Sequence, residues 1–511
     1  MNNDNKNNNN YVWPVRSDND SLRLFSFKNV YRQYIKCRKN KRGTINALKF
    51  EVNCEENLLD LKRQLDERSY CPSRSVCFMV TKPKLREIFA ADFRDRIVHH
   101  ILVDYLEKIW EPRFIFDSYA CRKKKGIHGA VKRLQVFMRK VTQNGSRKAY
   151  FIKLDVKNFF MSIDKDILYT IIAGKVQDER ALWLTKLLVY HDCTTNYILK
   201  GDRDYLKKIP PHKSLLYTEC KKGLPIGNLT SQFFANVYLN QLDQFIKHHL
   251  KCRYYLRYCD DFVMLSNDRD MLLKWKDEIE YFLADRLELR LNAKRQSLQP
   301  VSNGIDFLGY IVRRNYILAR KRVVNNLKSK LDVYESQLVK NNPPYQKLSY
   351  DYPILEKLGA TLASYFGHFK WANSSRLQMS LVTRYRFLEK FFTFKEGKFT
   401  ATYRTPQNIP SIRLQYHYFK TKFARDVLLF QVGRYYQFYQ NNDAGAQLLG
   451  LRKIHTLSDR KAKYGFPTRF ENVYIRKLKK YGRSVTVVGE GDTYLTRVKE
   501  RVPRYRLVVG Q

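Results

Sequence analysis

The fold is decided by the stretch RYYLRYCDDFVML, which runs from Arg253 to Leu265. Aromatic, β-branched and aliphatic residues lie on both sides of the Asp260–Asp261 pair, a pattern that predicts two strands joined as a hairpin with the carboxylates at its tip. Adjacent aspartates are also common in ordinary turns, because their side chains hydrogen-bond the nearby backbone. The pair therefore needs a second observation before it indicates chemistry.

The second observation is the stretch FIKLDVKNFF, residues 151–160. It predicts an apolar strand with one acidic residue, Asp155, in its middle, where a purely structural strand would carry none. If Asp155 lies beside Asp260, two like charges about 4 Å apart repel by roughly 4 kcal/mol at an effective dielectric of about 20, so a divalent ion has to bridge them. Carboxylate oxygens without imidazole or thiolate select Mg²⁺ or Mn²⁺, and a pair of such ions supports in-line nucleotidyl transfer.

Together with a third motif, these stretches resemble the palm of a reverse transcriptase. The third motif is GLPIGNLTSQ, residues 223–232, which lies between the other two in the order and spacing of that family. The resemblance implies an α+β right-hand polymerase with fingers, palm and a helical thumb, followed by a small C-terminal α/β domain. It further implies catalysis by Asp155, Asp260 and Asp261, with two Mg²⁺ or Mn²⁺ ions held by these residues and Val156.

The expected domain organisation follows from this resemblance and from composition. We expect residues 1–20 to be a disordered Asn-rich tail, 21–150 an N-terminal helical extension and fingers, 151–315 the palm, 316–400 the helical thumb and 401–511 a nucleic-acid-binding domain. The Asn tract cannot bury a core.

Charge and cysteine content limit the function classes. The chain has 95 Lys and Arg against 49 Asp and Glu, a net charge of +46, which indicates a polyanionic partner. No apolar run is long enough to cross a membrane and no signal peptide is evident, so nucleic acid is the expected partner rather than a membrane. The nine cysteines form no pattern of a zinc module or a disulfide framework, and a reducing cytoplasm is the expected compartment.

Several residues are expected to contact the incoming nucleotide. Residues 77–89 predict two strands joined at a Lys-Pro turn, and the resemblance assigns Lys84 and Arg86 there to the triphosphate; an ordinary solvated hairpin is the alternative. Phe160 stands five residues after the strand aspartate, at the family's steric gate against a ribose 2′-hydroxyl, with a core Phe as the alternative. Lys294 matches the lysine that approaches the leaving pyrophosphate, and a solvated Lys is again the alternative.

The third motif departs from the commonest pattern of the family. Most reverse transcriptases carry Gln-Gly-x-x-x-Ser-Pro there, whereas this chain has Ile226-Gly227-x-x-x-Ser231-Gln232. This is similar to the reverse transcriptases of diversity-generating retroelements, which copy a template-repeat RNA and misincorporate opposite its adenines. It implies an error-prone enzyme that places Ile226, Gly227 and Gln232 at the nucleotide, with the glycine allowing close approach of backbone to nucleotide.

The resemblance also implies the partners. They are an RNA template, a DNA primer with its cDNA, and deoxynucleoside triphosphates, and a small basic accessory protein of the retroelement is a candidate partner. Antiphage defence reverse transcriptases share parts of the motif pattern and are the alternative assignment. A catalytically idle nucleic-acid-binding protein is a third class, against which the intact aspartate set argues.

Two further regions are expected to contact nucleic acid. The loop Ser118–His128 resembles a family motif that would place its four consecutive cations on phosphates; these are Arg122, Lys123, Lys124 and Lys125. The stretch VLLFQVGRYYQFY, residues 427–439, resembles the opening of the mismatch-binding domain of MutS, in which a Phe stacks on a mispaired base and a Glu hydrogen-bonds it. Tyr435 and Gln437 stand at those positions, so mismatch reading and general duplex binding both remain open.

Periodicity predicts the main helices. Asp92–Trp110 and the residues from Val324 to Leu338 have apolar side chains at helical spacing, and Pro343–Pro344 is expected to end the second helix. The Lys-rich loop between Lys200 and Lys213 receives no role from the sequence.

Overall fold

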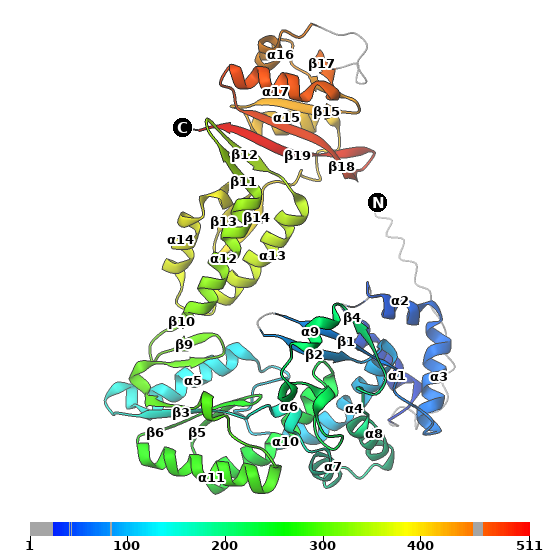
Figure 1. Ribbon diagram of the computed structural model, residues 1–511, viewed down its shortest axis with the longest axis vertical. Coiled ribbons are helices and arrows are strands. Elements are labelled where there is room, and N and C mark those ends of the chain that lie inside the picture. Colours follow the sequence, from blue (N-terminus) through cyan, green and yellow to red (C-terminus); the bar gives the residue numbers. More distant parts are fainter. Residues whose placement is uncertain (1–23, 40, 42, 82–83, 453–462, 511) are drawn as a thin grey trace, which may run out of the picture. The chain divides into compact units, whose positions relative to one another are not determined.

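The computed structural model describes residues 24–39, 41, 43–81, 84–452 and 463–510. It divides into two compact units, one made of Met1–Leu308 with Val312–Asn315 and the other of Gly309–Ile311 with Tyr316–Gln511. Helices and strands are mixed in both units (Figure 1), which confirms the expected α+β class. Within the described ranges, every helix is too short or too polar to cross a membrane.

The first unit is built around a four-stranded antiparallel sheet with the order β5-β6-β3-β7. Its strands are β3 (Tyr150–Asp155), β5 (Tyr254–Tyr258), β6 (Asp261–Ser266) and β7 (Ser297–Pro300). Helix α5 (Ile127–Val141) contacts β5 and β6, whereas α11 (Arg269–Leu287) contacts β3 and β6. In Figure 1 these two helices lie on opposite faces of the sheet. This is the expected palm.

The predicted hairpin is present, but its two aspartates occupy different positions: Asp260 lies in the turn and Asp261 begins β6. Tyr258 pairs with Asp261, so Cys259 and Asp260 form the two-residue turn, and Cys259 takes the left-handed φ of 56° that such turns require. The third carboxylate, Asp155, does not lie in the middle of its strand as expected. Strand β3 ends at Asp155, and the chain then turns into the short helix α6 (Phe159–Ser162).

The fingers form a separate three-stranded sheet with the order β2-β1-β4. Strands β1 (Ser75–Val80) and β2 (Arg86–Ala90) are the predicted antiparallel pair, and the Lys82–Pro83 turn between them lies outside the described residues. Strand β4 (Tyr197–Lys200), which the sequence did not predict, joins β1 in parallel.

Helices complete this unit. The N-terminal extension contains α1 (Phe27–Arg38), α2 (Ile45–Val52) and α3 (Cys54–Asp66), and α1 packs on both α3 and the predicted helix α4 (Phe93–Trp110). The others are α7 (Lys165–Ala173), α8 (Glu179–Tyr190), α9 (Arg203–Lys207) and α10 (Leu229–Gln244). Helix α10 packs on α4, α7 and α11, so its buried face joins the N-terminal part of the unit to the palm.

The thumb range of the second unit combines helices with hairpins. Helix α12 (Lys321–Leu338) buries the predicted apolar stripe, but it is not ended by Pro343–Pro344. It ends at Leu338, and the two prolines form the turn of a hairpin of β11 (Val339–Asn342) and β12 (Tyr345–Ser349). Then follow α13 (Tyr352–Phe369), α14 (Ser375–Arg384), β13 (Phe392–Lys395) and β14 (Lys398–Ala401).

The C-terminal sheet has seven strands in the order β11-β12-β19-β18-β15-β16-β17. Its own elements are α15 (Ile412–Lys422), β15 (Val427–Val432), β16 (Tyr435–Phe438), α16 (Ala444–Leu449), β17 (Tyr464–Pro467), α17 (Glu471–Lys480), β18 (Val485–Leu495) and β19 (Val498–Val509). Apolar side chains of one face pack with α16 and α17, and those of the other face pack with α15. Because β12 pairs with β19, the sheet includes a hairpin from the expected thumb.

A buried ion pair joins the central strands of this sheet. Arg506 on β19 donates from Nε to Oδ2 of Asp426 at 2.6 Å and from Nη2 to Oδ1 at 2.9 Å, and the hydroxyl of Thr486 on β18 donates to the same carboxylate. The Asp426 side chain is fully buried, whereas that of Arg506 is 22% exposed.

We expect Arg506→Met to lower the free energy of unfolding by about 3 kcal/mol, because it leaves the buried carboxylate of Asp426 without its cation. Chemical denaturation followed by the fluorescence or circular dichroism of the whole protein measures the change. Arg497→Met is the matched control, since Arg497 is exposed near the β18–β19 turn. Equal stabilities of the two variants would contradict this account.

Candidate active site

Strand pairing brings the three predicted carboxylates together. In the β3–β6 ladder Asp155 stands opposite Asp261, and the backbone N–H of Val156 donates to the carbonyl of Asp260 at 3.3 Å. Asp155 is 4% exposed, and the two hairpin acids are half-buried. The site therefore lies where the end of β3 meets the β5–β6 turn.

A segment after α11 holds Asp155 in place. Asn292 donates its backbone N–H to the Asp155 carbonyl at 2.8 Å and its side-chain amide to Oδ2 at 2.9 Å. Nη1 of Arg295 lies 3.3 Å from the same Oδ2. The predicted residue Lys294 is exposed in the same short turn, so Arg295, which the sequence analysis missed, is the cation that contacts the aspartate.

The positive charge beside the three carboxylates is smaller than their negative charge. Burial raises the pKa of Asp260 to about 6, and repulsion from Asp155 adds to the rise. Burial also raises the pKa of Asp261, against which Lys153, with Nζ 3.5 Å from Oδ2, acts to lower it. Such a cluster is most stable when a further cation joins it.

These residues suit a hard divalent cation, because all three side chains offer carboxylate oxygens. Among the described residues, no three His, Cys, Asp or Glu side chains already close around one point as a complete ligand set. The fit therefore rests on donor chemistry and on the raised pKa of Asp260.

A buried ion pair supports the catalytic turn from below. Arg257 on β5 is fully buried and donates to both carboxylate oxygens of Asp243 on α10, at 2.8 and 2.6 Å. Its Nη1 also donates to the carbonyl of Cys259 in the turn at 3.0 Å. In the sequence, Arg257 and Asp243 are each a charged residue in a largely apolar stretch. Nothing local in the sequence indicates that they pair with each other.

The predicted fingers cations follow the undescribed residues 82–83. Lys84 and Arg86 are both exposed. Burial lowers the pKa of Lys84, the cations of Arg295 and Arg86 lower it further, and Asp155 acts to raise it. The interaction between Lys84 and Asp155 means that this predicted fingers cation lies near the palm carboxylate.

The third motif contacts the fingers rather than open space. The carbonyl of Ile226 accepts from the N–H of Phe89 on β2 at 3.0 Å. A Cβ on Gly227 would stand 2.7 Å from Cγ2 of Ile88 and 3.2 Å from the Phe89 carbonyl. This glycine therefore permits close approach to strand β2, while its expected contact with a nucleotide stays a prediction.

Two other predicted nucleotide contacts, Phe160 and Ile226, lie at one apolar cluster, which we call the fingers–palm cluster. Its buried members are Cys77, Phe89, Met161, Cys193 and Leu215. Phe160 and Ile226 are half-buried and pack at its margin. Gln232 is exposed on α10, where its side-chain oxygen lies 3.4 Å from Sγ of Cys121. Phe160 and Ile226 thus share one environment, whereas Gln232 lies apart.

The basic loop does not present four free cations. The side chain of Arg122 is only 6% exposed and binds Glu111 and the carbonyls of Ile115 and Ser118. Nζ of Lys123 lies 2.5 Å from Glu107.

Lys124 and Lys125 differ from each other. Nζ of Lys125 lies 3.4 Å from the ring centre of Phe116 and donates to its carbonyl, whereas Lys124 is exposed. Three of the four cations predicted to bind phosphates therefore already have partners within the protein.

The two predicted contacts of the C-terminal domain lie on a covered face. Gln437 on β16 is fully buried and accepts from the hydroxyl of Tyr439 at 3.0 Å. Tyr435 is half-buried and packs with the cluster that includes Tyr416 and Phe419 of α15. Because α15 covers this face, Gln437 cannot reach a base, which corrects the sequence-based expectation.

Two parts of the chain match protein-family models. Residues 80–312 match the model described as reverse transcriptase (RNA-dependent DNA polymerase). Residues 410–507 match the model described as MutS domain I. The expected reverse transcriptase domain and the MutS-like C-terminal region are both confirmed at this level.

Curated relatives are distant. Protein YkfC of Escherichia coli is 23% identical over 290 residues, which cover 50% of this chain and 71% of that protein. The group II intron-encoded protein LtrA of Lactococcus lactis is 23% identical over 324 residues, so that this chain spans about half of its length. Among solved structures, apo telomerase from Candida tropicalis is similar at 13% identity and a TM-score of 0.36, over 62% of this chain and 60% of that one.

The raised pKa of Asp260 yields a stability test. Its pKa of about 6, above the ordinary 3.8, means that the ionised group destabilises the folded state above pH 6, and that this cost fades as the pH falls through 6. We therefore expect metal-free Asp260→Asn protein to melt a few degrees higher than wild type at pH 7, with the difference disappearing near pH 4.

Thermal melting across this pH range, with and without added MgCl₂, measures the effect. Added Mg²⁺ should raise the melting temperature of wild type more than that of Asp260→Asn. Glu56→Gln, at an exposed acid of α3, is the control and should show neither effect. A difference in melting temperature that did not vary with pH would contradict the account in which the carboxylates have too little positive charge beside them.

Proposed function

We propose that this chain, whose residues 80–312 form a reverse transcriptase domain, copies RNA into DNA with Asp155, Asp260 and Asp261 as its catalytic carboxylates. The observation that carries the proposal is the β3–β6 register, which sets Asp155 opposite Asp261 beside the turn that bears Asp260. Three acids in one place have no structural purpose of their own, because they repel each other.

Members of this domain family depend on divalent metal ions, and we propose two Mg²⁺ or Mn²⁺ ions here, held by Asp155, Val156, Asp260 and Asp261. Such ions stabilise the charge that develops on the reacting phosphate. The chain's own cations then neutralise the rest of the triphosphate: Arg295 contacts Asp155 and Lys84 interacts with it, and we assign Arg86 and Lys294 to the same task.

Substrate selection is assigned to the margin of the fingers–palm cluster. We propose that the half-buried ring of Phe160 closes the space that a ribose 2′-hydroxyl would need. Ile226 stands at the same margin and offers only a branched apolar surface, where most reverse transcriptases have a Gln amide.

Within the superfamily we propose an error-prone enzyme of a diversity-generating retroelement, acting on a template-repeat RNA. The departure at Ile226 and Gln232 supports this subclass. The net charge of +46 supports RNA, primer and cDNA as partners. A small basic accessory protein remains part of the proposal.

For the MutS-like region we propose duplex binding rather than mismatch reading. The side chain that would have to hydrogen-bond a mispaired base, Gln437, is fully buried beneath α15. Exposed cations of the region can bind phosphates, among them Lys479 and Lys480 at the end of helix α17.

Primer extension on an RNA template tests the main proposal. We expect Mg²⁺-dependent DNA synthesis that falls by about a hundredfold or more in Asp155→Asn, because the substitution removes one charge from the metal-binding set. Asp285→Asn on the exposed face of α11 is the matched control and should synthesise DNA like wild type. Near-normal synthesis by Asp155→Asn would reject the assigned site.

Sequencing of cDNA tests the subclass. We expect Ile226→Gln to lower the error frequency several-fold to tenfold while synthesis continues, because a restored hydrogen bond of about 1 kcal/mol rewards correct geometry. Ile226→Val, which keeps an apolar branched side chain, should retain the wild-type errors, concentrated opposite template adenine. An accurate wild type, or equal error spectra, would favour an antiphage defence enzyme instead.

A further inference from the structure

The segment from Tyr197 to Tyr217 belongs structurally to the fingers. Strand β4 continues the fingers sheet through its parallel pairing with β1, in which Ser75 stands opposite Tyr197. The apolar side chains of the segment pack on the fingers–palm cluster; they are Tyr197, Leu199, Leu206, Leu215 and Leu216. The Lys-rich loop is therefore fixed to the same cluster that carries Phe160 and Ile226.

A buried carboxylate fixes the end of this segment. Glu87 on β2 is 2% exposed, and its carboxylate accepts from the hydroxyl of Ser214 at 2.8 Å and from the backbone N–H of Leu215. Burial raises the pKa of Glu87, and these two hydrogen bonds oppose the rise. Because Glu87 follows Arg86 directly, it ties the position of residue 213 to that of a predicted triphosphate ligand.

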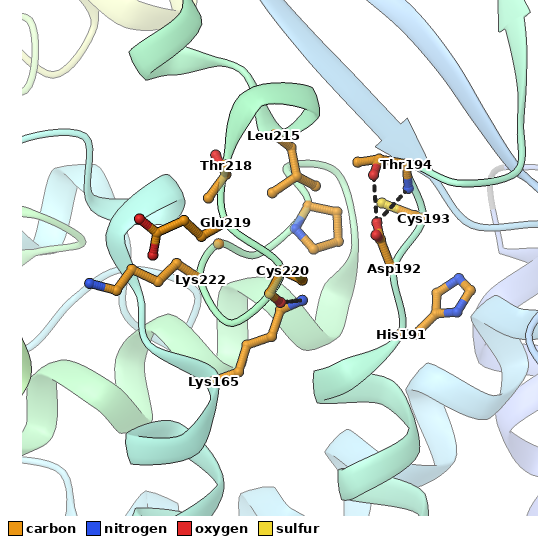
Figure 2. Close-up of a pocket in the computed structure, with 12 residues that line it drawn as sticks. Lys165, His191, Asp192, Cys193, Thr194, Leu215, Thr218, Glu219, Cys220 and Lys222 are labelled. Atoms are coloured by element: carbon orange, nitrogen blue, oxygen red, sulfur yellow. Dashed lines mark hydrogen bonds between the residues drawn. The ribbon is translucent and has the colours of Figure 1, made fainter.

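A second anchor follows on the other side of Leu215. Figure 2 shows a hollow with Leu215 and the loop from Thr218 to Lys222 along one side and His191–Thr194 along the other. Nζ of Lys165 donates to the carbonyl of Cys220 at 2.9 Å, which fastens this loop to α7. The hollow has a volume of only about 20 Å³, which is enough for roughly one water molecule, so it is not a ligand site. The anchor at this place is the hydrogen bond from Lys165 to Cys220.

Lys213 directly precedes Ser214, the residue that Glu87 holds. The Lys213 side chain is exposed. Burial is the largest cause that lowers the pKa of Lys84, and the cations of Arg295, Arg86 and Lys213 lower it further. Within the described residues, none of Lys84, Arg86 and Lys213 forms an ion pair with a carboxylate. Arg295, Arg86 and Lys213 therefore all lie near enough to Lys84 to act on it, with Asp155 as the opposing acid, and such a group of cations favours a polyanion.

We propose that Lys213 is a third cation for the incoming triphosphate, beside Lys84 and Arg86, and that Glu87 is the positioning residue that holds it there. The inference deepens the proposed function and rests on it. It gives the Lys200–Lys213 loop a role, because the loop brings a phosphate ligand from outside the fingers hairpin.

Binding of inorganic tripolyphosphate tests the site without polymerisation. Calorimetry on the full-length chain should give a Kd that rises about fivefold to tenfold in Lys213→Gln, as expected for one lost charge-assisted contact. Lys208→Gln is the matched control, since Lys208 is an exposed lysine of the same loop that lies over the Tyr205 ring. An unchanged Kd in Lys213→Gln overturns the proposal, as does an equal loss in both variants.

Kinetics separate a triphosphate contact from a structural role. In Lys213→Gln we expect the KM for deoxynucleotides to rise by a similar factor while kcat stays within about twofold, and Lys213→Arg should restore KM. Affinity for single-stranded RNA should not change. A loss of RNA affinity with normal tripolyphosphate binding would assign Lys213 to the template and overturn the proposal.

The role of Glu87 is tested by non-additivity. If Glu87 positions Lys213, then Lys213→Gln should weaken tripolyphosphate binding much less in the Glu87→Ala background than in wild type. Full additivity overturns the positioning role. Because Glu87→Ala removes a buried group, melting of each variant must first establish that it is folded.

The two proposals fail in different ways. A protein that binds tripolyphosphate through Lys213 but makes no DNA on RNA retains this site and rejects the proposed function. A protein that copies RNA with Lys213→Gln kinetics equal to wild type retains the function and rejects this site.

Discussion

The structure depends on one electrostatic constraint: strand pairing forces three carboxylates together at one end of the palm sheet. The register cannot slip to relieve the repulsion, because a shift of one residue would move every side chain of the shifted strand to the opposite face of the sheet, against the wrong helix. The surroundings therefore supply the opposite charge. Lys153 approaches Asp261 and Arg295 approaches Asp155, yet Asp260 still has a raised pKa. The site is left short of positive charge, which is the state that suits a metal-dependent phosphoryl-transfer enzyme.

Buried ion pairs recur where segments distant in sequence must meet. Arg257 and Asp243 join the catalytic hairpin to α10, and Arg506 and Asp426 join β19 to the start of β15. Each pair is costly to desolvate and repays this cost only in one geometry, so it stabilises a single arrangement more than it stabilises the fold as a whole. In the palm that arrangement includes the carbonyl of Cys259, and hence the turn that carries Asp260. The geometry of the catalytic turn thus depends on the buried Arg257–Asp243 pair beneath it.

Local patterns in the sequence predicted the palm strands, the fingers hairpin, helix α4 and helix α12, because alternation and helical spacing are visible within a short window. Contacts between distant residues were not predictable in this way. Nothing local says that Glu87 meets Ser214, that β4 joins β1, or that the hairpin at Pro343–Pro344 pairs with β19. Spacing also could not decide which of two adjacent cations, Lys294 or Arg295, turns toward Asp155. For Gln437 the motif suggested a base contact, and only the position of α15 excludes it.

Strand β2 links two properties that are usually treated separately. Its residues alternate, so that Arg86 points to solvent, Glu87 is buried against the 214–215 backbone, and Phe89 contacts Ile226 and Gly227. The proposed triphosphate ligand Arg86 and the proposed nucleotide contact Ile226 therefore share one strand as support. A change at Ile226 can reach the phosphate ligands through Phe89, and a change at Glu87 can reach Ile226 through Leu215 and the fingers–palm cluster. If Ile226 sets fidelity as proposed, fidelity is then a property of that cluster, built from β1, β2, α6, the 193–217 segment and the third motif, and not of Ile226 alone.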